Sequence, residues 1–537
     1  MSARPARPAR AEGGDGGRGG DVTTGLGRST AVFAAWTGVS RIAGLIREIV
    51  AAAIFGTSGA ISAFVVAFNV PNLLRSLVAD SALSAAFVPV FTELEEQGRK
   101  REAQRLVGAF IGLISMVLGL ITLLAIVLAP WLMPLFAPGL DQSLVDETVR
   151  LARIMFPIVV LLGLTGLVAA VLQAAGEFGI TAFVPVLWNV IIIAGLVVVT
   201  PIVPDDDRIT VYAVAIVVGT LAQLLYMVPA FRRQGPFPIS FGWRSPRVRQ
   251  VLILMLPVTL GLGLINVNLT VDTIFATLVS DQAPRAIDAA FRLYLLPQGV
   301  FSVAISTVLF PAISRLAARD DAAGMRSAIA RGLRQIFFML LPASAFLLVL
   351  AEPVVRLVFQ RGEFDAESTS LTSEALVFFA VGLAFNGASL LVIRAFFSLQ
   401  QPWLATKVAA LGVVLNAALD AVLYGPLGTG GIPLATSLSS MVTFAVMAWL
   451  LNRELGGVHG AWVVDGVVRS LVASGVSALL AWCVWRVLDD ALGRSLVAQI
   501  VSVGSAVAAA AFAYLAAAQA FDMGELRALG RLRRPLP

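Results

Sequence analysis

Residues 40–94 read SRIAGLIREIVAAAIFGTSGAISAFVVAFNVPNLLRSLVADSALSAAFVPVFTEL. Two apolar runs meet in this stretch, one on either side of residues 57–59, and each run is longer than the about 20 residues that cross a bilayer. Hydrocarbon offers no water to a backbone amide, so each amide must be paired within its own segment. Helices meet this requirement, and the stretch therefore predicts two membrane-spanning helices.

The same pattern continues along nearly the whole chain. Of its 537 residues, 58% are apolar and 13% are charged, and the mean hydropathy is +0.88. A soluble domain carries about 25% charged residues, so this chain has too few to cover a wetted surface. We predict an all-α polytopic membrane protein with fourteen transmembrane helices, at residues 29–56, 60–92, 106–136, 147–174, 180–203, 209–231, 248–279, 284–316, 328–351, 368–399, 403–424, 430–451, 464–487 and 494–520.

The positive charges lie in short connectors between the apolar runs. The formal net charge is +6, but the arginines do not form the continuous stripe that nucleic-acid binding needs. The basic connectors fall on one side of the predicted topology, around residues 99–105, 232–249, 315–334 and 453–469. By the positive-inside rule, we expect a plasma-membrane protein with both termini in the cytoplasm and no nucleic-acid partner.

The cysteine and histidine content of the chain excludes two further kinds of site. The only cysteine, Cys483, lies in an apolar run, and the only histidine, His459, lies in a polar connector. One of each cannot form a disulfide framework or a Cys/His metal cluster. The sequence contains neither the paired carboxylates nor the nucleophile–base arrangement that would indicate an enzyme. A membrane-embedded transferase is therefore the weakest of the functional alternatives.

Several segments of the first half of the chain recur in the second half. The matching segments are separated by 220 to 223 residues, and they are Ile54-Phe55 with Ile274-Phe275, Ala67-Phe68 with Ala290-Phe291, Leu128-Ala129 with Leu350-Ala351, and Gly139 with Gly362. Each repeat holds six predicted spans, so the two halves are predicted to be parallel copies, an arrangement typical of transporters. The predicted division is a basic tail at 1–28, an N-lobe at 29–240, a C-lobe at 241–455, two added helices within 456–522, and a basic tail at 523–537.

Charged residues occur inside the predicted spans, where each costs about 2.5–3.5 kcal/mol on insertion scales. The first span contains Arg41, Arg47 and Glu48. Arg41 and Glu48 are seven residues apart and therefore share a helix face. These arginines either reach an interface with their long side chains or form buried pairs, or they line a cavity.

Two further arginines lie close to prolines in corresponding spans of the two halves. Arg75 follows Pro71, and Arg292 precedes Pro297. Proline removes a backbone hydrogen bond and can bend a helix. We predict that Arg75 and Arg292 share a cationic cavity. The guanidinium fork binds phosphate oxygens in pairs, so the predicted cargo is an anion, such as a phosphate ester.

The second half contains a different polar set. Asn416 and Asp420 are one helical turn apart, Asp272 is a second carboxylate within a span, and Thr436 lies early in the next span. Hard oxygen ligands without His or Cys suit Na⁺, Ca²⁺ or a proton. The alternative is that these polar groups only hydrogen-bond helices together.

The quoted stretch and AAFRLYLLPQGVFSVAISTVLFPAISR, residues 289–315, resemble the MurJ (MviN) family of lipid II flippases. This family belongs to the superfamily that includes MATE exporters and polysaccharide flippases. The likeness runs from about residue 29 to 520, and PNLLR followed by AFVP is a fairly specific signature. It implies alternating-access transport of the polyprenyl-pyrophosphate-linked cell-wall precursor, lipid II.

The resemblance also implies roles for particular residues. The family's cavity arginines match Arg41, Arg47, Arg75 and Arg292, and the polar residues assigned to the gate or cavity wall are Glu48, Asn72 and Asp80. Some relatives hold a sodium ion, whose ligands match Asp272, Asn416, Asp420, the carbonyl of Ile432, and Thr436. Apart from this Na⁺, no cofactor is expected. The last two helices would line a groove for the lipid tail.

Two positions depart from the family pattern. Ser62 stands where relatives often have an acid, and Phe291 stands where some have Asp before the arginine of the eighth span. The ion pairs around the cavity are therefore expected to differ from those of relatives. The expected partners are lipid II, membrane lipids, and the machinery of cell-wall synthesis or division. The alternatives are a flippase for another polyprenyl-linked glycan and a cation-coupled multidrug exporter.

Overall fold

The structure is a computed structural model that describes residues 18–78, 80–242 and 245–526. The described residues form helices and connecting turns, without a β-strand. The α-helices are α1 (Arg18–Phe55), α2 (Gly59–Val78), α3 (Asp80–Glu96), α4 (Lys100–Phe136), α5 (Gln142–Met155), α6 (Ile158–Ala174), α7 (Phe178–Ala194), α8 (Arg208–Arg233), α9 (Pro246–Val279), α10 (Ala283–Ala318), α11 (Ala322–Val349), α12 (Ala351–Phe359), α13 (Ala366–Ser398), α14 (Pro402–Glu454), α15 (Gly460–Leu492) and α16 (Leu496–Ala520).

The described residues contain ten helical stretches that are long and apolar enough to cross a membrane. The all-helical membrane class is therefore confirmed. Two of these stretches are interrupted. The predicted fourth span consists of α5 and α6, which are separated at Pro157, where a helix-interior proline would remove a hydrogen bond. The helix α14 covers two predicted spans, and Gly428 interrupts it with a positive φ of 51° that glycine adopts without strain.

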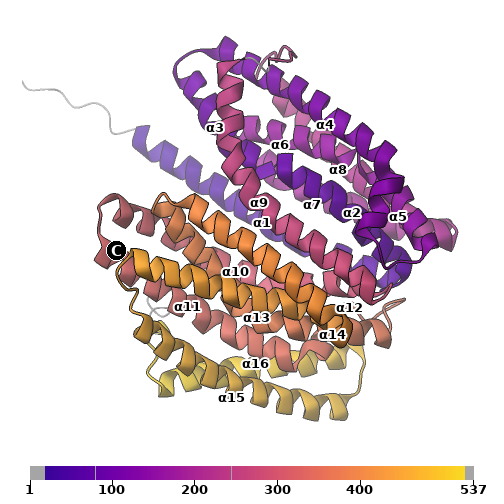
Figure 1. The fold of residues 1–537 in the computed structure, drawn as a ribbon, viewed down its shortest axis with the longest axis vertical. Coiled ribbons are helices and arrows are strands. Elements are labelled where there is room, and N and C mark those ends of the chain that lie inside the picture. Colours follow the sequence, from indigo (N-terminus) through magenta and orange to yellow (C-terminus); the bar gives the residue numbers. More distant parts are fainter. Residues whose placement is uncertain (1–17, 79, 243–244, 527–537) are drawn as a thin grey trace, which may run out of the picture.

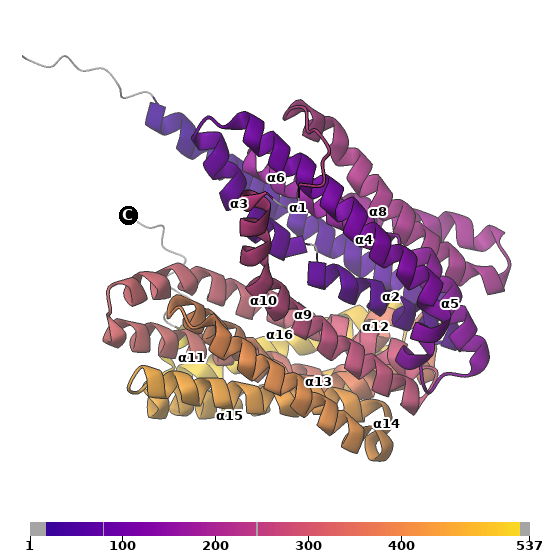
Figure 2. The same cartoon turned by 45° about the horizontal axis from the view of Figure 1, so that its top comes forward.

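The helices gather into two groups (Figure 1). Helices α1 to α8 form one group, helices α10 to α16 form the other, and α9 runs along the boundary between them. α9 packs against α2 and α3 on one side and against α14 on the other. From here the first group is called the N-lobe, and α9 with the second group is called the C-lobe. Figure 2 shows the same separation from another direction.

Each lobe has its own apolar core. The largest buried cluster comes almost entirely from α10 to α14, and two others come mainly from helices α2 to α8, one of them together with Val248, Val251 and Met255 at the start of α9. Outward-facing side chains are apolar as well: on α4, Leu123, Val127, Trp131 and Leu135 follow one helix face and are all exposed. Such a continuous apolar face suits contact with lipid. Separate cores allow the lobes to move relative to each other as bodies.

The lobes touch through backbone at the end where α1 finishes. The N–H of Glu363, in the turn after α12, donates to the carbonyl of Ala53 at 2.9 Å. A Cβ atom at Gly362 would lie 2.2 Å from this carbonyl oxygen, and a Cβ at Gly56 would lie 2.3 Å from the carbonyl oxygen of Glu363. Both glycines also have positive φ angles, of 58° and 57°. Only glycine permits this approach.

A third glycine makes the reciprocal contact. Gly139 follows α4 in the N-lobe, and a Cβ there would lie 2.1 Å from the carbonyl oxygen of Thr277, near the end of α9. Gly139 and Gly362 are the matching glycines of the sequence comparison. Each lobe thus places a loop on the end of the other lobe's first helix: the loop after α4 contacts α9, and the turn after the short helix α12 contacts α1. Gly56, Gly139 and Gly362 are called the glycine latch below.

The two last helices are fixed to the C-lobe. α15 packs against α16 and α11, and in Figure 1 this pair lies at the edge of the C-lobe farthest from the N-lobe. Arg334 of α11 pairs with Glu525 after α16 and lies over the ring of Trp462 at 4.0 Å. Arg356 of α12 pairs with Asp489 of α15. These two ion pairs, Arg334–Glu525 and Arg356–Asp489, are called the anchors.

Candidate functional site

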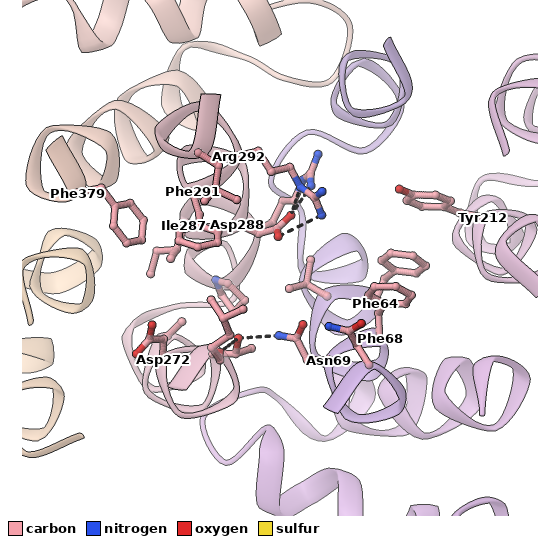
Figure 3. A pocket seen from close by; sticks show the side chains of 18 residues that line it. Phe64, Phe68, Asn69, Tyr212, Asp272, Ile287, Asp288, Phe291, Arg292 and Phe379 are labelled. Atoms are coloured by element: carbon pink, nitrogen blue, oxygen red, sulfur yellow. Dashed lines mark hydrogen bonds and ion pairs between the residues drawn. The ribbon is translucent and has the colours of Figure 1, made fainter. Parts of the chain in front are cut away.

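A cavity of about 260 Å³ lies between the lobes. Residues of α2, α8, α9, α10 and α13 line it, and Figure 3 shows aromatic and polar side chains facing one another across the space. Phe64 and Phe68 come from the N-lobe, and Phe291 and Phe379 come from the C-lobe. The polar lining residues are Asn69, Asn72, Tyr212, Asp272, Thr273, Arg285, Asp288 and Arg292.

One carboxylate joins the lobes beside this cavity. Glu48 of α1 is only 4% exposed and accepts from three guanidinium groups. Arg47 donates at 2.6 Å, Arg292 lies at 3.1 Å and Arg285 donates at 3.2 Å. Arg285 and Arg292 belong to α10, so the contacts of Glu48 cross from the N-lobe to the C-lobe.

A second carboxylate completes the set. Asp288 of α10 accepts from Arg285 at 2.9 Å and from Arg292 at 3.0 Å, and Figure 3 shows Asp288 beside Arg292. We call Arg47, Glu48, Arg285, Asp288 and Arg292 the Glu48 cluster. Three positive and two negative charges leave the cluster with a formal charge of +1.

Sequence reasoning missed Arg285 and Asp288. The signal was present, because Arg285 and Arg292 are seven residues apart and Asp288 stands three and four residues from them, on the same helix face. Arg285 was overlooked since it lies at the first turn of its predicted span. Some relatives have Asp immediately before the arginine of the eighth span, where this chain has Phe291. In this chain the acid that pairs with Arg292 is Asp288, one helical turn before it.

Arg47 of α1, which is also predicted to bind the cargo, points into the N-lobe rather than into the cavity. Arg47 is buried, donates to Asn189 of α7 at 3.1 Å and lies over the ring of Trp188 at 4.6 Å. It is not among the residues that line the cavity. Arg47 therefore holds Glu48 from the N-lobe side, and its own guanidinium packs inside that lobe.

Arg41 lies farther along the same seam. Its guanidinium comes within 3.4 Å of the position that a Cβ atom at Gly299 would take. Gly299 is seven residues after Arg292, just as Arg41 is seven residues before Glu48. The antiparallel helices α1 and α10 thus face each other at two levels, and Arg41, which is exposed, occupies the level nearer the beginning of α1.

Arg75 and Asn72 belong to a polar contact between α2 and α9. The side-chain oxygen of Asn72 accepts from Arg75 at 2.7 Å and 3.0 Å, and its amide donates to Asn266 of α9 at 3.1 Å. Nearby, Asn69 donates to Thr273 at 2.7 Å. Asn72 and Arg292 line the cavity, whereas Arg75 is hydrogen-bonded to Asn72 and is not itself among the lining residues.

For Ser62 of α2 and Asp80 of α3, the described part of the structure gives no cavity contact. Ser62 is fully buried, and its hydroxyl has no hydrogen-bond partner among the described residues. The side chain of Asp80 lies outside the described part of the structure.

The predicted ion ligands come together within the C-lobe. The amide of Asn416 donates to Asp272 at 2.5 Å and to Asp420 at 2.9 Å, and Thr436 donates to Asp272 at 3.3 Å. Asp272 is 5% exposed, and Asp420 and Ile432 are fully buried. The oxygen Oδ1 of Asn416 and the oxygen Oδ1 of Asp420 have no hydrogen-bond partner among the described residues. Unpaired oxygens beside two carboxylates fit a hard cation or a proton.

Comparison with known proteins gives one consistent family. The family model of the lipid II flippase MurJ matches residues 51–501. The lipid II flippase MurJ of Burkholderia cenocepacia is 31% identical over 472 residues, which cover 85% of this chain and 90% of that protein. The probable lipid II flippase MurJ of Vibrio cholerae serotype O1 is 28% identical over 486 residues, covering 87% of this chain and 92% of the relative.

Solved structures share the fold. A lipid II flippase MurJ in an inward closed conformation aligns with a TM-score of 0.75 at 20% identity, covering 91% of this chain and 98% of that one. An inward-facing MATE-family multidrug transporter of the MOP superfamily aligns with a TM-score of 0.68 at 14% identity, covering 78% of this chain and 94% of that one. At these identities the likeness concerns the fold alone.

Proposed function

This chain belongs to the MurJ family of lipid II flippases, and we propose that it carries lipid II from the cytoplasmic to the outer leaflet through the cavity between its lobes. It is a transporter rather than an enzyme. The observation that carries the proposal is the Glu48 cluster beside the cavity, in which arginines of both lobes share Glu48 and one positive charge is in excess; Arg285 and Arg292 of this cluster line the cavity. This charge suits an anionic head group and disfavours cationic drugs.

The pyrophosphate of the cargo would compete with Glu48 for its arginines. Guanidinium groups bind phosphate oxygens with two parallel hydrogen bonds, which a single shared carboxylate cannot offer to three arginines at once. Binding of the head group would therefore release Glu48 from Arg292 and loosen the contact between α1 and α10. In this scheme Arg41 and Arg75 attract the head group before it reaches Arg292.

The proposed topology has fourteen spans in two six-helix repeats and an added pair. The first repeat consists of α1, α2 with α3, α4, α5 with α6, α7 and α8; the second consists of α9, α10, α11, α13 and the two parts of α14. The added pair is α15 and α16. The predicted boundaries at residues 240 and 455 fall between these groups. With both termini in the cytoplasm, the glycine latch closes the outer end of the cavity.

Transport then requires the lobes to rock so that the latch opens and the cytoplasmic end closes. The separate cores of the lobes support such movement. The prenyl tail would stay in lipid beside α15 and α16, and because the anchors tie these helices to the C-lobe, they would travel with it. Partners from cell-wall synthesis or division remain a prediction of the family resemblance.

Coupling to an ion is a separate part of the proposal. Asp272, Asn416, Asp420, the carbonyl of Ile432 and Thr436 would hold Na⁺ when the lobe is in the right conformation. The unpaired oxygens of Asn416 and Asp420 support this assignment. Membrane potential is the alternative driving force, since the cluster beside the cavity carries net charge.

The test is depletion of this protein in its own cells, followed by measurement of lipid II in each leaflet. Accumulation in the inner leaflet with loss from the outer one is the expected result. An unchanged distribution would contradict the proposal and favour a flippase for another polyprenyl-linked glycan, which the same cells can be assayed for. Expulsion of cationic dyes that depends on this protein would instead favour the drug exporter.

A further inference from the structure

Arg285 is a buried arginine whose hydrogen-bonding groups are only partly used. It is the third residue of α10, is 2% exposed and lines the cavity. Its Nη1 atom donates to Glu48 and to Asp288. Its Nε and Nη2 atoms are buried and have no hydrogen-bond partner among the described residues. Guanidinium has five N–H donors, and leaving buried donors unmatched is costly.

Charge balance within the Glu48 cluster does not account for Arg285. The two carboxylates, Glu48 and Asp288, already match the charges of Arg47 and Arg292. Arg285 adds a third positive charge without a third acid. Asp272, the other acid that lines the cavity, is bonded to Asn268, Asn416 and Thr436. A buried excess cation beside a cavity needs an anion from outside the chain.

The position of Arg285 gives its place in the transport path. Residues 285, 292 and 299 lie on one face of α10, and each is two turns, or about 10 Å by helix rise, from the next. Arg41 lies near Gly299, Arg292 is in the middle, and Arg285 is nearest the turn at residues 280–282. Arg285 and Arg292 also share both of their carboxylates. An anion can therefore pass from one guanidinium to the other without losing its counter-charge.

We propose that Arg285 forms a second anion subsite, at the end of the cavity next to the α9–α10 turn, which holds a phosphate or carboxylate oxygen of the cargo after it leaves Arg292. This inference rests on the proposed flippase function and adds to it a site for the later part of the path. The shared chemistry is an oxyanion bound by the free N–H groups of one guanidinium.

Binding to the purified full-length protein in lipid nanodiscs tests the subsite. The probes are inorganic pyrophosphate and a short peptide containing glutamate, and isothermal titration calorimetry gives the dissociation constants. The variant Arg285→Gln should weaken binding of at least one probe by about tenfold, the value of one charge-assisted hydrogen bond. Loss for pyrophosphate alone assigns the site to the phosphates, and loss for the peptide alone assigns it to carboxylates.

Two further variants separate binding from folding. Arg285→Lys keeps the charge but not the fork and should show a smaller loss than Arg285→Gln. Arg486→Gln is the matched control, because Arg486 is an exposed arginine of α15 that pairs only with Asp490 among the described residues, and its probe affinities should equal those of the wild type. Thermal unfolding of each variant checks folding, and the Lys variant decides if the Gln variant does not fold.

Lipid II flipping in proteoliposomes distinguishes the two proposals. If the wild type flips lipid II while Arg285→Gln binds both probes and flips normally, the subsite is wrong and the flippase function stands. If Arg285→Gln slows flipping but binds both probes normally, Arg285 has only a structural role, and the subsite is again wrong. If the wild type does not flip lipid II, the proposed function itself fails.

Discussion

The Glu48 cluster and the anchors are both built from buried or half-buried arginines and carboxylates, but they are organised differently. In the cluster, Glu48 is shared by three arginines and Asp288 by two, across the boundary between lobes. In the anchors, each arginine has one carboxylate. Arg334 is in addition stacked on Trp462.

The difference in organisation points to a difference in use. A carboxylate shared among several arginines can exchange partners while every group keeps some counter-charge, so the contact can change at low cost. A one-to-one pair has no substitute, and separating it strands two charges in a medium of low dielectric constant. The comparison therefore assigns movement to the boundary between lobes and rigidity to the attachment of α15 and α16.

The largest expected effect is loss of stability at an anchor. Replacing Asp489 with Asn leaves Arg356 buried without its counter-charge, which should lower the free energy of unfolding by about 3–5 kcal/mol. Denaturation by titration with SDS in detergent micelles measures this. The double variant Arg356→Met, Asp489→Leu should recover most of the stability. A single variant as stable as the wild type would show that the anchor is not rigid.

The next effect concerns transport rather than stability. Arg292→Ala should reduce lipid II flipping in proteoliposomes at least about 100-fold, which corresponds to about 2.7 kcal/mol, because it removes the arginine that Glu48 and Asp288 share. Its unfolding should stay close to wild type, since the lobe cores do not depend on it. Arg486→Ala, at an exposed pair, should flip normally. An equal loss of flipping in Arg292→Ala and Arg486→Ala would contradict a special role of the Glu48 cluster in transport.

A smaller effect is expected at the glycine latch. A Cβ atom at Gly362 would collide with the carbonyl of Ala53, so Gly362→Ala should disfavour the closed boundary about tenfold, or about 1.4 kcal/mol. The matched control is Gly119→Ala on α4, where no atom lies within 4 Å of the added methyl group. Because the clash is between lobes, each lobe should remain folded.

Spin labels can measure this shift. Cysteines at Ser143 of α5 and Ser370 of α13, both exposed, would report the separation of the lobes in a Cys483→Ser background. Double electron–electron resonance should show longer distances for Gly362→Ala than for Gly119→Ala. Identical distance distributions would mean that the latch does not hold the lobes together.

The smallest effect is a local one that belongs to neither region. Asp365 caps α13 by accepting from the N–H of Ser368 at 2.8 Å, and this bond holds the pKa of the carboxyl below its usual value. Asp365→Ala should cost about 1 kcal/mol at neutral pH. A lowered pKa stabilises the fold fully above the unfolded value of about 3.9, so the difference should shrink as the pH falls below that value and be lost once the pH passes below the lowered pKa of the folded state. Unfolding at pH 7 and pH 3 measures this.

Sequence patterns predicted the helical membrane class because apolar run length is a direct requirement of the bilayer. They also identified Arg292, Glu48 and the Asp272–Asp420 pair, since charges inside apolar runs are conspicuous. They could not show that Arg47 packs against Trp188 inside the N-lobe, because that direction depends on tertiary packing. Arg285 was missed for a related reason: near a predicted helix end, an arginine resembles one that reaches for the interface.

The glycine latch has a consequence for how easily the lobes separate. The glycine latch makes its close contacts with backbone carbonyl groups of the other lobe, Gly56 with Glu363, Gly139 with Thr277 and Gly362 with Ala53. Adhesion between surfaces grows with the apolar area removed from solvent. Because backbone contacts remove little apolar area, the latch glycines themselves add little adhesion, and in the proposed transport cycle these contacts can part and re-form without exposing additional apolar side chains to water.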